Sequence, residues 1–332
     1  MMSFNNIGII GSTSWGITLA NVLINNVENV HILARNQKEA QNLNKERQIV
    51  RNKIYKLHQN ISVSDNYEKT ISSSEIILLA VPSYSVAKNI SKFKEHLSKD
   101  KIIVSAVKGF EYNSKKTISQ YLLQETNIDK KNIGVLSGPN ISSEIYDGLP
   151  ATTVLGINEE YEENIRIIFN TDTFRAYSSN DIIGIEIGGI LKNIFAIGAG
   201  IISEYNFGTN AMASYITRSM IEIKKISVLF GGMELTNYGN SGLGDLITTC
   251  FNNKSRNNQL GQLLAKGIAL SDAKEKINGV IEGVYSTEII KSILDKENLE
   301  TPIIDQIYNV LFMNKNPIEG INDLMSRDFT TE

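Results

Sequence analysis

The chain has 332 residues, of which 42% are apolar, and its formal net charge at pH 7 is −3. This length is typical of two domains with a sizeable core, and the near-neutral charge excludes the basic field that attracts nucleic acid or anionic membranes. The single cysteine, Cys250, excludes an internal disulfide framework and a multi-cysteine zinc site, so we expect a reducing, cytoplasmic environment and no bound metal.

The N-terminal sequence lacks the pattern of a targeting segment. Residues 1–7 contain no basic stretch and no long apolar run, so we expect no signal peptide. The apolar run Ile197–Ile202 is too short to cross a bilayer, and no other run approaches ~20 residues. We therefore expect no membrane insertion.

The first half of the chain alternates short apolar runs with amphipathic segments. We expect strands at Phe4–Ile10, Val30–Ala34, Glu75–Val81, Lys101–Ala106, Asn132–Leu136, Ala151–Ile157 and Thr173–Ser178. We expect helices at Ser14–Asn26, Ser83–Leu97, Lys115–Glu125 and Glu159–Asn170. This alternation predicts an α/β fold whose N-terminal domain is a parallel, doubly wound Rossmann sheet.

The pattern becomes helical from about Asp181. Long helical periodicities cover Ile182–Ile202 and Asn210–Phe230, and further helices continue through Leu324 with glycine-rich loops among them. No strand pattern persists in this part. We therefore predict a second, all-helical C-terminal domain, with the domains at residues 1–179 and 180–332.

A glycine-rich loop, Gly11-Ser-Thr-Ser-Trp-Gly16, separates the first expected strand from the first helix. Dinucleotide-binding proteins use such a loop to bring the backbone and a helix N-terminus close to the pyrophosphate. Gly11 and Gly16 match the first and third glycines of G-x-G-x-x-G, but Thr13 occupies the middle position. An ordinary structural turn is the alternative, and the location at the first strand favours a cofactor loop.

Arg35 follows the second expected strand, about 20 residues beyond the loop, where NAD sites often carry an acidic residue for the ribose hydroxyls. A guanidinium suits a 2′-phosphate, which favours NADP(H), and the alternative is a surface arginine beside a helix start. The expected cofactor is therefore NADP(H) or NAD(H).

Lysines are better acid/base candidates here than histidines. His31, His58 and His96 all lie in the N-terminal half, and none has a sequence context that suggests a histidine–carboxylate pair. Lys108 follows the fourth expected strand, at the sheet edge where doubly wound folds bind ligands. Lys192 lies on an otherwise apolar, glycine-rich helix. Burial of its charge there is costly unless the lysine has a partner or a catalytic role, and the alternative is a side chain that extends to solvent.

Several ordered segments make the sequence resemble one family, the bacterial NAD(P)-dependent glycerol-3-phosphate dehydrogenases. The matching segments are Gly11–Gly16, Ala80-Val-Pro-Ser83, Val107-Lys-Gly-Phe-Glu111, Leu136-Ser-Gly-Pro-Asn140, Gly188-Gly-Ile-Leu-Lys-Asn193, Gly208-Thr-Asn-Ala211, Gly242-Leu-Gly-Asp-Leu246, Ser255-Arg-Asn257 and Val280-Ile-Glu-Gly283. The resemblance implies a homodimer that interconverts dihydroxyacetone phosphate and sn-glycerol 3-phosphate by hydride transfer, supplying glycerophospholipid synthesis. It makes the first domain dinucleotide-binding and the second substrate-binding.

The resemblance also implies residue roles. The catalytic residues implied are Lys192, which resembles the proton donor and acceptor, and Lys108, which resembles a ligand of both substrate and cofactor and would stabilise the developing alkoxide. The other substrate-binding residues implied are Gly138, Asn140, Asp245, Ser255, Arg256 and Asn257. The cofactor-binding residues implied are Gly11, Ser14, Trp15, Gly16, Arg35, Asn36, Ser142, Arg256, Val280 and Glu282. Structural alternatives are a helix cap at Ser255 and a loop cap at Asp245.

The sequence departs from the family pattern at a few positions. Thr13 replaces a glycine, Asn140 a serine or threonine, and Ser142 an alanine, and Gly239-Asn-Ser-Gly242 differs from the usual Gly-Leu-Ala-Gly. These changes bear on cofactor affinity and on the substrate loop, and none removes a chemical group from the implied reaction.

Other functions remain as alternatives. A 6-phosphogluconate dehydrogenase also uses a lysine and is the runner-up. A 3-hydroxyacyl-CoA dehydrogenase would need a histidine–carboxylate pair after the sheet domain, and no histidine lies beyond His96. A UDP-sugar dehydrogenase would need an activated cysteine, and Cys250 has no neighbouring base in sequence. A nucleotide sensor without catalysis is favoured only by Thr13.

Overall fold

The computed structural model describes residues 4–51 and 53–328, so the first three residues of the expected N-terminus lie outside the described part. It divides into two compact units, Met1–Glu186 and Ile187–Glu332. In the described residues the first unit contains strands and helices and the second only helices, as expected. The division falls within one long helix, α8 (Ile182–Glu204), whereas we placed the boundary at residue 179.

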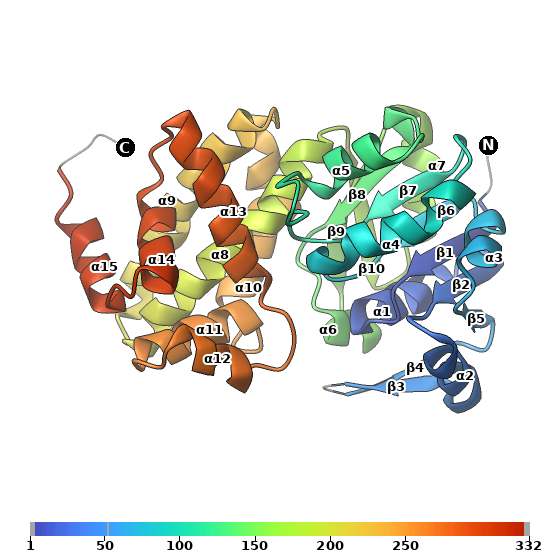
Figure 1. Cartoon of the computed structure of the whole chain (residues 1–332), viewed down its shortest axis with the longest axis horizontal. Coiled ribbons are helices and arrows are strands. Elements are labelled where there is room, and N and C mark those ends of the chain that lie inside the picture. Colours follow the sequence, from blue (N-terminus) through green and yellow to red (C-terminus); the bar gives the residue numbers. More distant parts are fainter. Residues whose placement is uncertain (1–3, 52, 329–332) are drawn as a thin grey trace. The chain divides into compact units, whose positions relative to one another are not determined.

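The first unit is built on an eight-stranded sheet with the order β10-β9-β8-β7-β6-β1-β2-β5 (Figure 1). Its strands are β1 (Asn6–Ile10), β2 (Asn29–Leu33), β5 (Ile61–Ser64), β6 (Ile76–Leu79), β7 (Ile102–Ser105), β8 (Ile133–Ser137), β9 (Ala151–Gly156) and β10 (Phe174–Ser179). The six strands from β5 to β8 are all parallel and have the order of a doubly wound dinucleotide-binding sheet. The chain reverses its winding direction between β1 and β6.

The sheet is parallel, as expected, except at one junction. Strand β9 pairs antiparallel with β8, although β9 and β10 are parallel to each other. The chain between β8 and β9 contains one five-residue helix, α6 (Ser142–Tyr146). Such a helix rises only about 7.5 Å, about half the length of a five-residue strand, so it does not carry the chain back along the sheet as a crossover helix does.

Both faces of the sheet are covered by helices. These are α1 (Ser14–Leu23), α2 (Gln37–Glu46), α3 (Tyr67–Ser72), α4 (Val86–Phe93), α5 (Ile118–Glu125) and α7 (Glu159–Phe169), with short 3₁₀ turns η1 (Ser83–Ser85), η2 (Lys94–His96) and η3 (Lys130–Asn132). The helix expected over Ser83–Leu97 is thus α4 flanked by two 3₁₀ turns. Figure 1 shows α4 and α5 side by side on one face.

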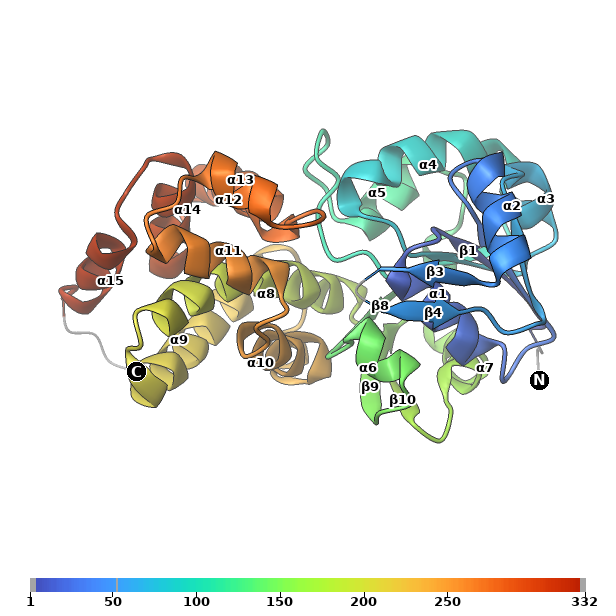
Figure 2. The same cartoon turned by 90° about the horizontal axis from the view of Figure 1, so that it is seen from below.

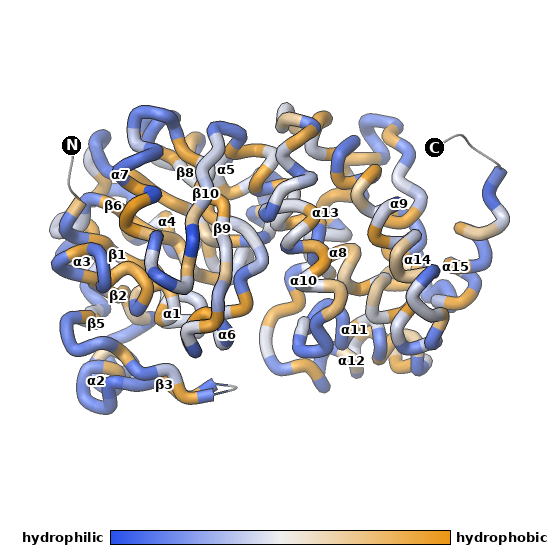
Figure 3. The backbone as a smooth tube through the Cα atoms, turned by 180° about the vertical axis from the view of Figure 1, so that it is seen from behind, coloured by the Kyte–Doolittle hydropathy of each residue, from blue (hydrophilic) through white to orange (hydrophobic). Residues whose placement is uncertain are grey.

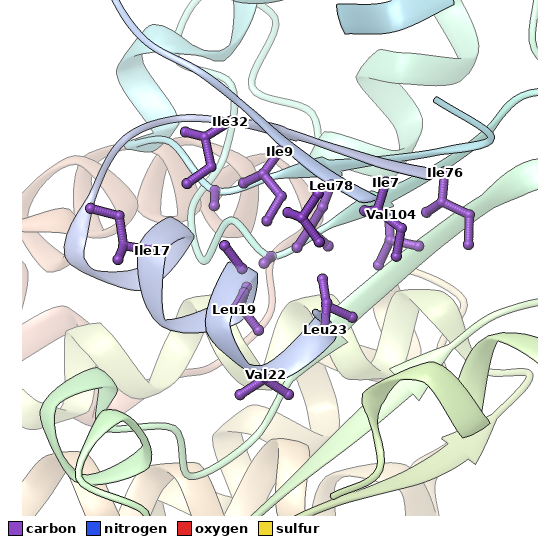
Figure 4. Close-up of a cluster of buried hydrophobic side chains, with 14 of the residues drawn as sticks. Ile7, Ile9, Ile17, Leu19, Val22, Leu23, Ile32, Ile76, Leu78 and Val104 are labelled. Atoms are coloured by element: carbon purple, nitrogen blue, oxygen red, sulfur yellow. The ribbon is translucent and has the colours of Figure 1, made fainter. Parts of the chain in front are cut away.

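The central strands are buried on both sides because successive side chains point to opposite faces. Ile76 and Leu78 of β6 join the cluster under α1, which includes Ile17, Leu19 and Leu23 (Figure 4). Ile77 and Leu79 join the other cluster, under α4 and α5. This two-sided burial explains why these strands read as continuous apolar runs in the sequence.

A small hairpin lies outside the main sheet and was not expected. Strands β3 (Gln48–Val50) and β4 (Ile54–Lys56) pair antiparallel with each other. Figure 2 shows the hairpin beside α1 and α2. Its short strands alternate buried and exposed residues, and Tyr55 on β4 packs edge-on against Tyr146 of α6 with ring centroids 4.9 Å apart.

The second unit consists of helices in its described residues. After α8 come α9 (Gly208–Leu229), η4 (Glu234–Tyr238), the π-helical turn η5 (Asn240–Gly244), α10 (Asp245–Cys250), α11 (Arg256–Ala265), α12 (Leu270–Lys276), α13 (Glu282–Glu297), α14 (Pro302–Phe312) and α15 (Pro317–Met325). Hydrogen bonds connect α8 to α9, α10 and α11 through Tyr215, Asp245 and Asn257.

Helix α8 is, among the described residues, the one helix long and apolar enough to cross a membrane by length and composition. The sequence inspection, which looked for uninterrupted apolar runs, did not identify it. Its most apolar window is 89% buried, as in the core helix of a folded domain. Figure 3 shows its hydrophobic colouring against the hydrophilic α2.

Candidate active site

The glycine loop follows β1 at the edge where the sheet changes its winding direction. Gly11 has φ +121°, which side chains rarely adopt, and a Cβ there would meet the carbonyl oxygen of Ala80 at 2.7 Å. A Cβ on Gly16 would meet the carbonyl oxygen of Gly11 at 2.1 Å. The loop therefore needs glycine at both positions, and it brings the start of α1 close to the residues after β6.

Thr13 is accommodated in this loop without backbone strain. Its φ is −78°, and it is the N-cap of α1, where its hydroxyl accepts a hydrogen bond from Gly16 N at 3.0 Å. The same hydroxyl donates to the carbonyl oxygen of Ala80 at 2.9 Å. The N–H groups of Ser14 and Trp15, in the first turn, have no acceptor within the helix, so this end of α1 keeps the character of an anion site.

The end of β2 carries an ion pair that sequence inspection did not identify. Arg35 is exposed, and its guanidinium binds the carboxylate of Glu39, with Nη2 2.9 Å from Oε1 and Nε 3.1 Å from Oε2. Asn36 caps α2 by accepting from Glu39 N at 3.0 Å. The sequence did contain a signal for this pair, because Arg35 and Glu39 are four residues apart at the start of a helix, where i and i+4 side chains meet.

Lys108 lies beside the loop that follows β8. Its Nζ donates to the carbonyl oxygen of Gly138 at 2.8 Å, so the structure brings these two predicted residues together. Asn140 is fixed in the same loop, where its amide donates to Thr152 O at 2.8 Å and accepts from the Thr153 hydroxyl at 2.9 Å. Asn140 therefore anchors the loop to β9.

Ser142, the other departure in this segment, begins α6, and its carbonyl oxygen accepts from the Thr18 hydroxyl on α1 at 3.2 Å. This contact ties the start of α6 to the helix that follows the glycine loop.

Lys192 on α8 is buried and is paired inside the second unit. Its Nζ lies 2.7 Å from Asp245 Oδ1 and 2.7 Å from Thr249 Oγ1. The exposed side-chain fractions are 11% for Lys192 and 1% for Asp245, so this lysine does not extend to solvent and its partner is a buried carboxylate. Thr249 in turn donates to the carbonyl oxygen of Asp245 at 2.7 Å.

Thr249 is the residue of this cluster that sequence inspection missed. It stands four residues after Asp245 on α10, so both side chains lie on one helix face. The π-helical turn η5 leads directly into Asp245, and such turns are frequent at functional sites.

The segment Ser255-Arg256-Asn257 begins α11. Ser255 caps the helix, Arg256 is exposed, and Asn257 is buried. The amide of Asn257 donates to Asn193 Oδ1 at 2.9 Å and accepts from Gly283 N at 3.0 Å. These bonds tie the start of α11 to α8, next to Lys192, and to α13.

The two remaining predicted residues, Val280 and Glu282, are partly buried around the start of α13. The guanidinium of Arg256 packs close to Gly279, whose Cβ would lie 2.6 Å from Nη1.

Models of one protein family match almost the whole chain. The model described as the NAD-dependent glycerol-3-phosphate dehydrogenase N-terminus matches residues 6–163, and that of the C-terminus matches residues 181–322. The chain belongs to this family. The family resemblance noted in the sequence is thereby confirmed.

Among relatives, the glycerol-3-phosphate dehydrogenase (NAD(P)+) of Fusobacterium nucleatum is 40% identical over 97% of this chain and 97% of its own length. That of Dehalococcoides mccartyi is 40% identical over 98% of this chain and 91% of its own. A crystal structure of glycerol-3-phosphate dehydrogenase from Coxiella burnetii superposes with a TM-score of 0.90 at 28% identity, covering 98% and 99% of the two chains. The chain thus has the length of the family enzymes, and its fold is theirs.

The residues of other dehydrogenase types do not form sites in the described part of this family member. Cys250 is buried, and burial raises the pKa of its thiol, which outweighs the effect of the nearby Lys192 charge, so it is not an activated nucleophile. His31 lies on β2 against the Ser62 hydroxyl, and burial lowers its pKa. Among the residues the structure describes, no group of three or more histidine, cysteine or acidic side chains forms a metal site.

Proposed function

We propose that this member of the family interconverts dihydroxyacetone phosphate and sn-glycerol 3-phosphate with a nicotinamide dinucleotide, and that Lys192 is its acid/base residue. The observation that carries the assignment to Lys192 is its burial against Asp245 and Thr249. A buried ammonium needs such partners, and a lysine held in this way can serve as the proton donor that reduction of a ketone requires.

The chemistry follows from the donors of this cluster. An ammonium group has three N–H donors, and the bonds to Asp245 and Thr249 account for two, which leaves capacity for a substrate oxygen. Lys192 can polarise the ketone and donate its proton as the alcohol forms, and Asp245 stabilises the ammonium in the opposite direction of reaction. Thr249 accepts a second hydrogen bond from Lys192 and so helps to hold the ammonium beside Asp245.

The glycine loop fits a dinucleotide. Gly11 and Gly16 leave no room for a Cβ, and the first-turn N–H groups of Ser14 and Trp15 can bind a pyrophosphate. When bound, the reduced nicotinamide supplies the hydride. We propose that Arg35 and Asn36 bind the adenosine half. The further residues that the family resemblance implies as cofactor ligands are Lys108, Ser142, Arg256, Val280 and Glu282.

We propose that the substrate phosphate binds at the start of α11. Arg256 presents a planar fork of donors at the first helical position, and the N-terminal end of a helix favours anions. Asn257 uses its amide to fix this helix start against Asn193 and Gly283. The other proposed substrate residues are Lys108, Gly138, Asn140, Asp245 and Ser255.

A substrate panel tests the proposed function. Oxidation of NADPH and NADH is followed at the nicotinamide absorbance with dihydroxyacetone phosphate, and 6-phosphogluconate with the oxidised cofactors serves as the alternative reaction. We expect turnover only with dihydroxyacetone phosphate. Turnover with 6-phosphogluconate alone would identify the runner-up, and tight cofactor binding without any turnover would identify a nucleotide sensor.

Two variants test the role of Lys192. Lys192→Arg keeps a charge opposite Asp245 but cannot release a proton near neutral pH, so we expect kcat to fall by about 10²–10⁴-fold. Lys192→Ala removes the donor altogether and should abolish turnover. Calorimetric binding of NADPH should be nearly unchanged in both, as in the control Lys276→Ala on the exposed side of α12. A near-normal kcat in Lys192→Arg would refute the proton-donor role.

A cytoplasmic location stays a prediction from the single cysteine. A supply of glycerophospholipid precursors and a homodimer stay predictions from the family resemblance. Sedimentation of the purified chain measures the last of these directly.

A further inference from the structure

The carboxylate of Glu39, on α2, lies next to the end of β2 and to the glycine loop. Its side chain extends from the first turn of α2 back to Arg35 at the end of β2, and the Ser12 hydroxyl of the glycine loop is one of the groups that lower the pKa of its carboxyl. Ser12 is 4% exposed and directly follows Gly11. Gly11 N in turn donates to the carbonyl oxygen of Leu33, the last residue of β2, at 3.2 Å. The carboxylate therefore lies where the loop after β1 meets the end of β2.

The carboxylate also holds the end of β2 itself. It accepts from the backbone N–H of Arg35 at 2.9 Å and from the guanidinium of Arg35 through both oxygens. Only 14% of the Glu39 side chain is exposed, against 74% of Arg35. Burial acts to raise the pKa of Glu39, but hydrogen bonds from Arg35 and Ser12 and the charge of Arg35 outweigh it and lower the pKa, so the group is ionised near neutral pH.

An ordinary surface ion pair explains this arrangement poorly. Pairs with one exposed partner contribute little to stability, because solvent screens them and long side chains lose freedom. Here the carboxylate instead binds the backbone N–H of Arg35 after β2 and lies near the Ser12 side chain in the glycine loop, and both border the place where Rossmann folds hold the adenosine ribose. In that place an acidic residue binds the ribose hydroxyls, and an arginine accommodates a 2′-phosphate. This chain has both groups, in contact with each other.

Glu39 is an acidic residue in otherwise basic surroundings. An open groove of about 400 Å³ lies beside the end of β2, between α2 and the hairpin. Arg35, Lys38 and Arg51 line it, and Glu39 is the only acidic residue among the described residues that line it. Without the Glu39 charge, this surface would be purely cationic and would suit a phosphate better than a sugar hydroxyl.

We propose that Glu39 is the residue that discriminates between the two cofactors, by accepting hydrogen bonds from the ribose hydroxyls and by disfavouring a 2′-phosphate. Arg35 acts in the opposite direction, because a 2′-phosphate can draw its guanidinium away from Glu39. The balance between the two cofactors is then set by competition between a carboxylate and a phosphate for one guanidinium. This inference rests on the proposed function, because it assumes that the glycine loop binds a nicotinamide dinucleotide.

Binding calorimetry tests the inference without relying on turnover. Dissociation constants for NADH and NADPH are measured for the unaltered chain, for Glu39→Gln and for Arg35→Gln. Glu39→Gln keeps the shape and removes the charge, and we expect the ratio Kd(NADPH)/Kd(NADH) to fall by about tenfold or more. Arg35→Gln should raise the same ratio. Glu46→Gln is the matched control, since Glu46 ends the same helix, is largely exposed and pairs only loosely with Lys45 at 3.7 Å.

Fragments locate the effect within the cofactor. Adenosine 2′,5′-bisphosphate should gain affinity in Glu39→Gln relative to adenosine 5′-monophosphate, because the two differ only in the 2′-phosphate. An unchanged ratio in Glu39→Gln, for the cofactors and for the fragments, would overturn the inference while leaving the proposed function intact. Failure of the unaltered chain to bind either NADH or NADPH would instead overturn the proposed function, and this inference with it.

Discussion

The hydroxyl of Thr13 makes two hydrogen bonds in the cofactor loop that a glycine at this position could not make. A glycine at this position would leave α1 without a side-chain cap, whereas Thr13 caps the helix and binds the carbonyl oxygen of Ala80. The hydroxyl therefore connects the two strands, β1 and β6, on either side of the point where the winding reverses. The departure from the glycine pattern is compatible with the fold of the loop because the φ of Thr13 is −78°.

Substitutions of Thr13 distinguish the loss of its hydrogen bonds from a return to the glycine that is usual in the family. Thr13→Val keeps the volume and loses both hydrogen bonds, so the free energy of unfolding should fall by about 1–2 kcal/mol, and the affinity for NADPH should fall with it. Thr13→Gly restores the family residue and should cost only a few tenths of a kcal/mol. Urea unfolding and calorimetric titration measure the two effects, with Thr13→Ser as the control that keeps the hydroxyl. Equal stability of Thr13→Val and Thr13→Ser would contradict the role given to these bonds.

Helices α8 and α11 approach each other at their backbones, and two glycines make this possible. A Cβ on Gly200 would lie 2.0 Å from the carbonyl oxygen of Asn258, and one on Gly261 would lie 1.9 Å from that of Ile197. The crossing fixes α11 against the helix that carries Lys192. It explains why a helix rich in glycine, a poor helix former, is nevertheless retained through 23 residues.

Gly200→Ala should force these helices apart. Overpacking typically costs 1–3 kcal/mol, and here the obstructing atoms are backbone, so we expect a loss of at least about 2 kcal/mol in the free energy of unfolding. Displacement of α11 should also raise the KM for dihydroxyacetone phosphate more than the KM for NADPH. Gly320→Ala on α15 is the control, because its Cβ would meet nothing closer than 3.4 Å. Thermal unfolding and steady-state kinetics distinguish the two variants, and equal behaviour would refute the packing argument.

The elements that sequence inspection predicted are those with strong, long patterns. Strand β6 is apolar on both faces, and α8 carries apolar residues over its whole length, so neither depended on distant contacts for its detection. The hairpin β3–β4 has three residues per strand and a mixed sequence, and its packing against Tyr146 lies about ninety residues away. The reversal at β9 depends on the path of the chain after β8, which local periodicity does not contain.

The predicted site shows the same distinction. Lys108 and Lys192 were identifiable because a lysine at a strand end or on an apolar helix is unusual. Glu39 and Thr249 were missed because an acidic residue in a first helical turn and a threonine in a helix are common. Only the fold places Glu39 against Ser12 and Thr249 against Lys192.

Each of the two units contains a buried carboxylate that joins one helix to the start of another. Glu186 on α8 accepts from Ser119 N at the start of α5 at 3.0 Å. Glu222 on α9 accepts from Ile303 N at 2.7 Å and Ile304 N at 3.1 Å at the start of α14. Burial raises the pKa of both carboxyls, against the opposing effect of these hydrogen bonds. Both units are therefore expected to lose stability as the pH rises and these groups ionise.

For Glu222 the pH range of the expected loss of stability can be stated. Burial, together with the charge of Asp305, raises its pKa from 4.5 to about 7, while Ile303 N, Ile304 N and Lys225 act in the other direction. Between these pH values the folded state holds a proton that the unfolded state has released, so the free energy of unfolding falls as the pH rises from about 4.5 to about 7. Below and above this range, Glu222 contributes no further change.

Glu222→Gln removes this titration, and the difference between the two chains isolates it from all other groups. The free energy of unfolding of the unaltered chain minus that of Glu222→Gln should fall by at most about 3 kcal/mol between pH 4.5 and pH 8, since one pKa unit corresponds to about 1.4 kcal/mol. Urea unfolding at four pH values measures it, with the exposed Glu275→Gln on α12 as the control. A difference that stays constant over this range would show that the pKa of Glu222 is not raised on folding, and one that rises would show that the amide donors of α14 outweigh its burial.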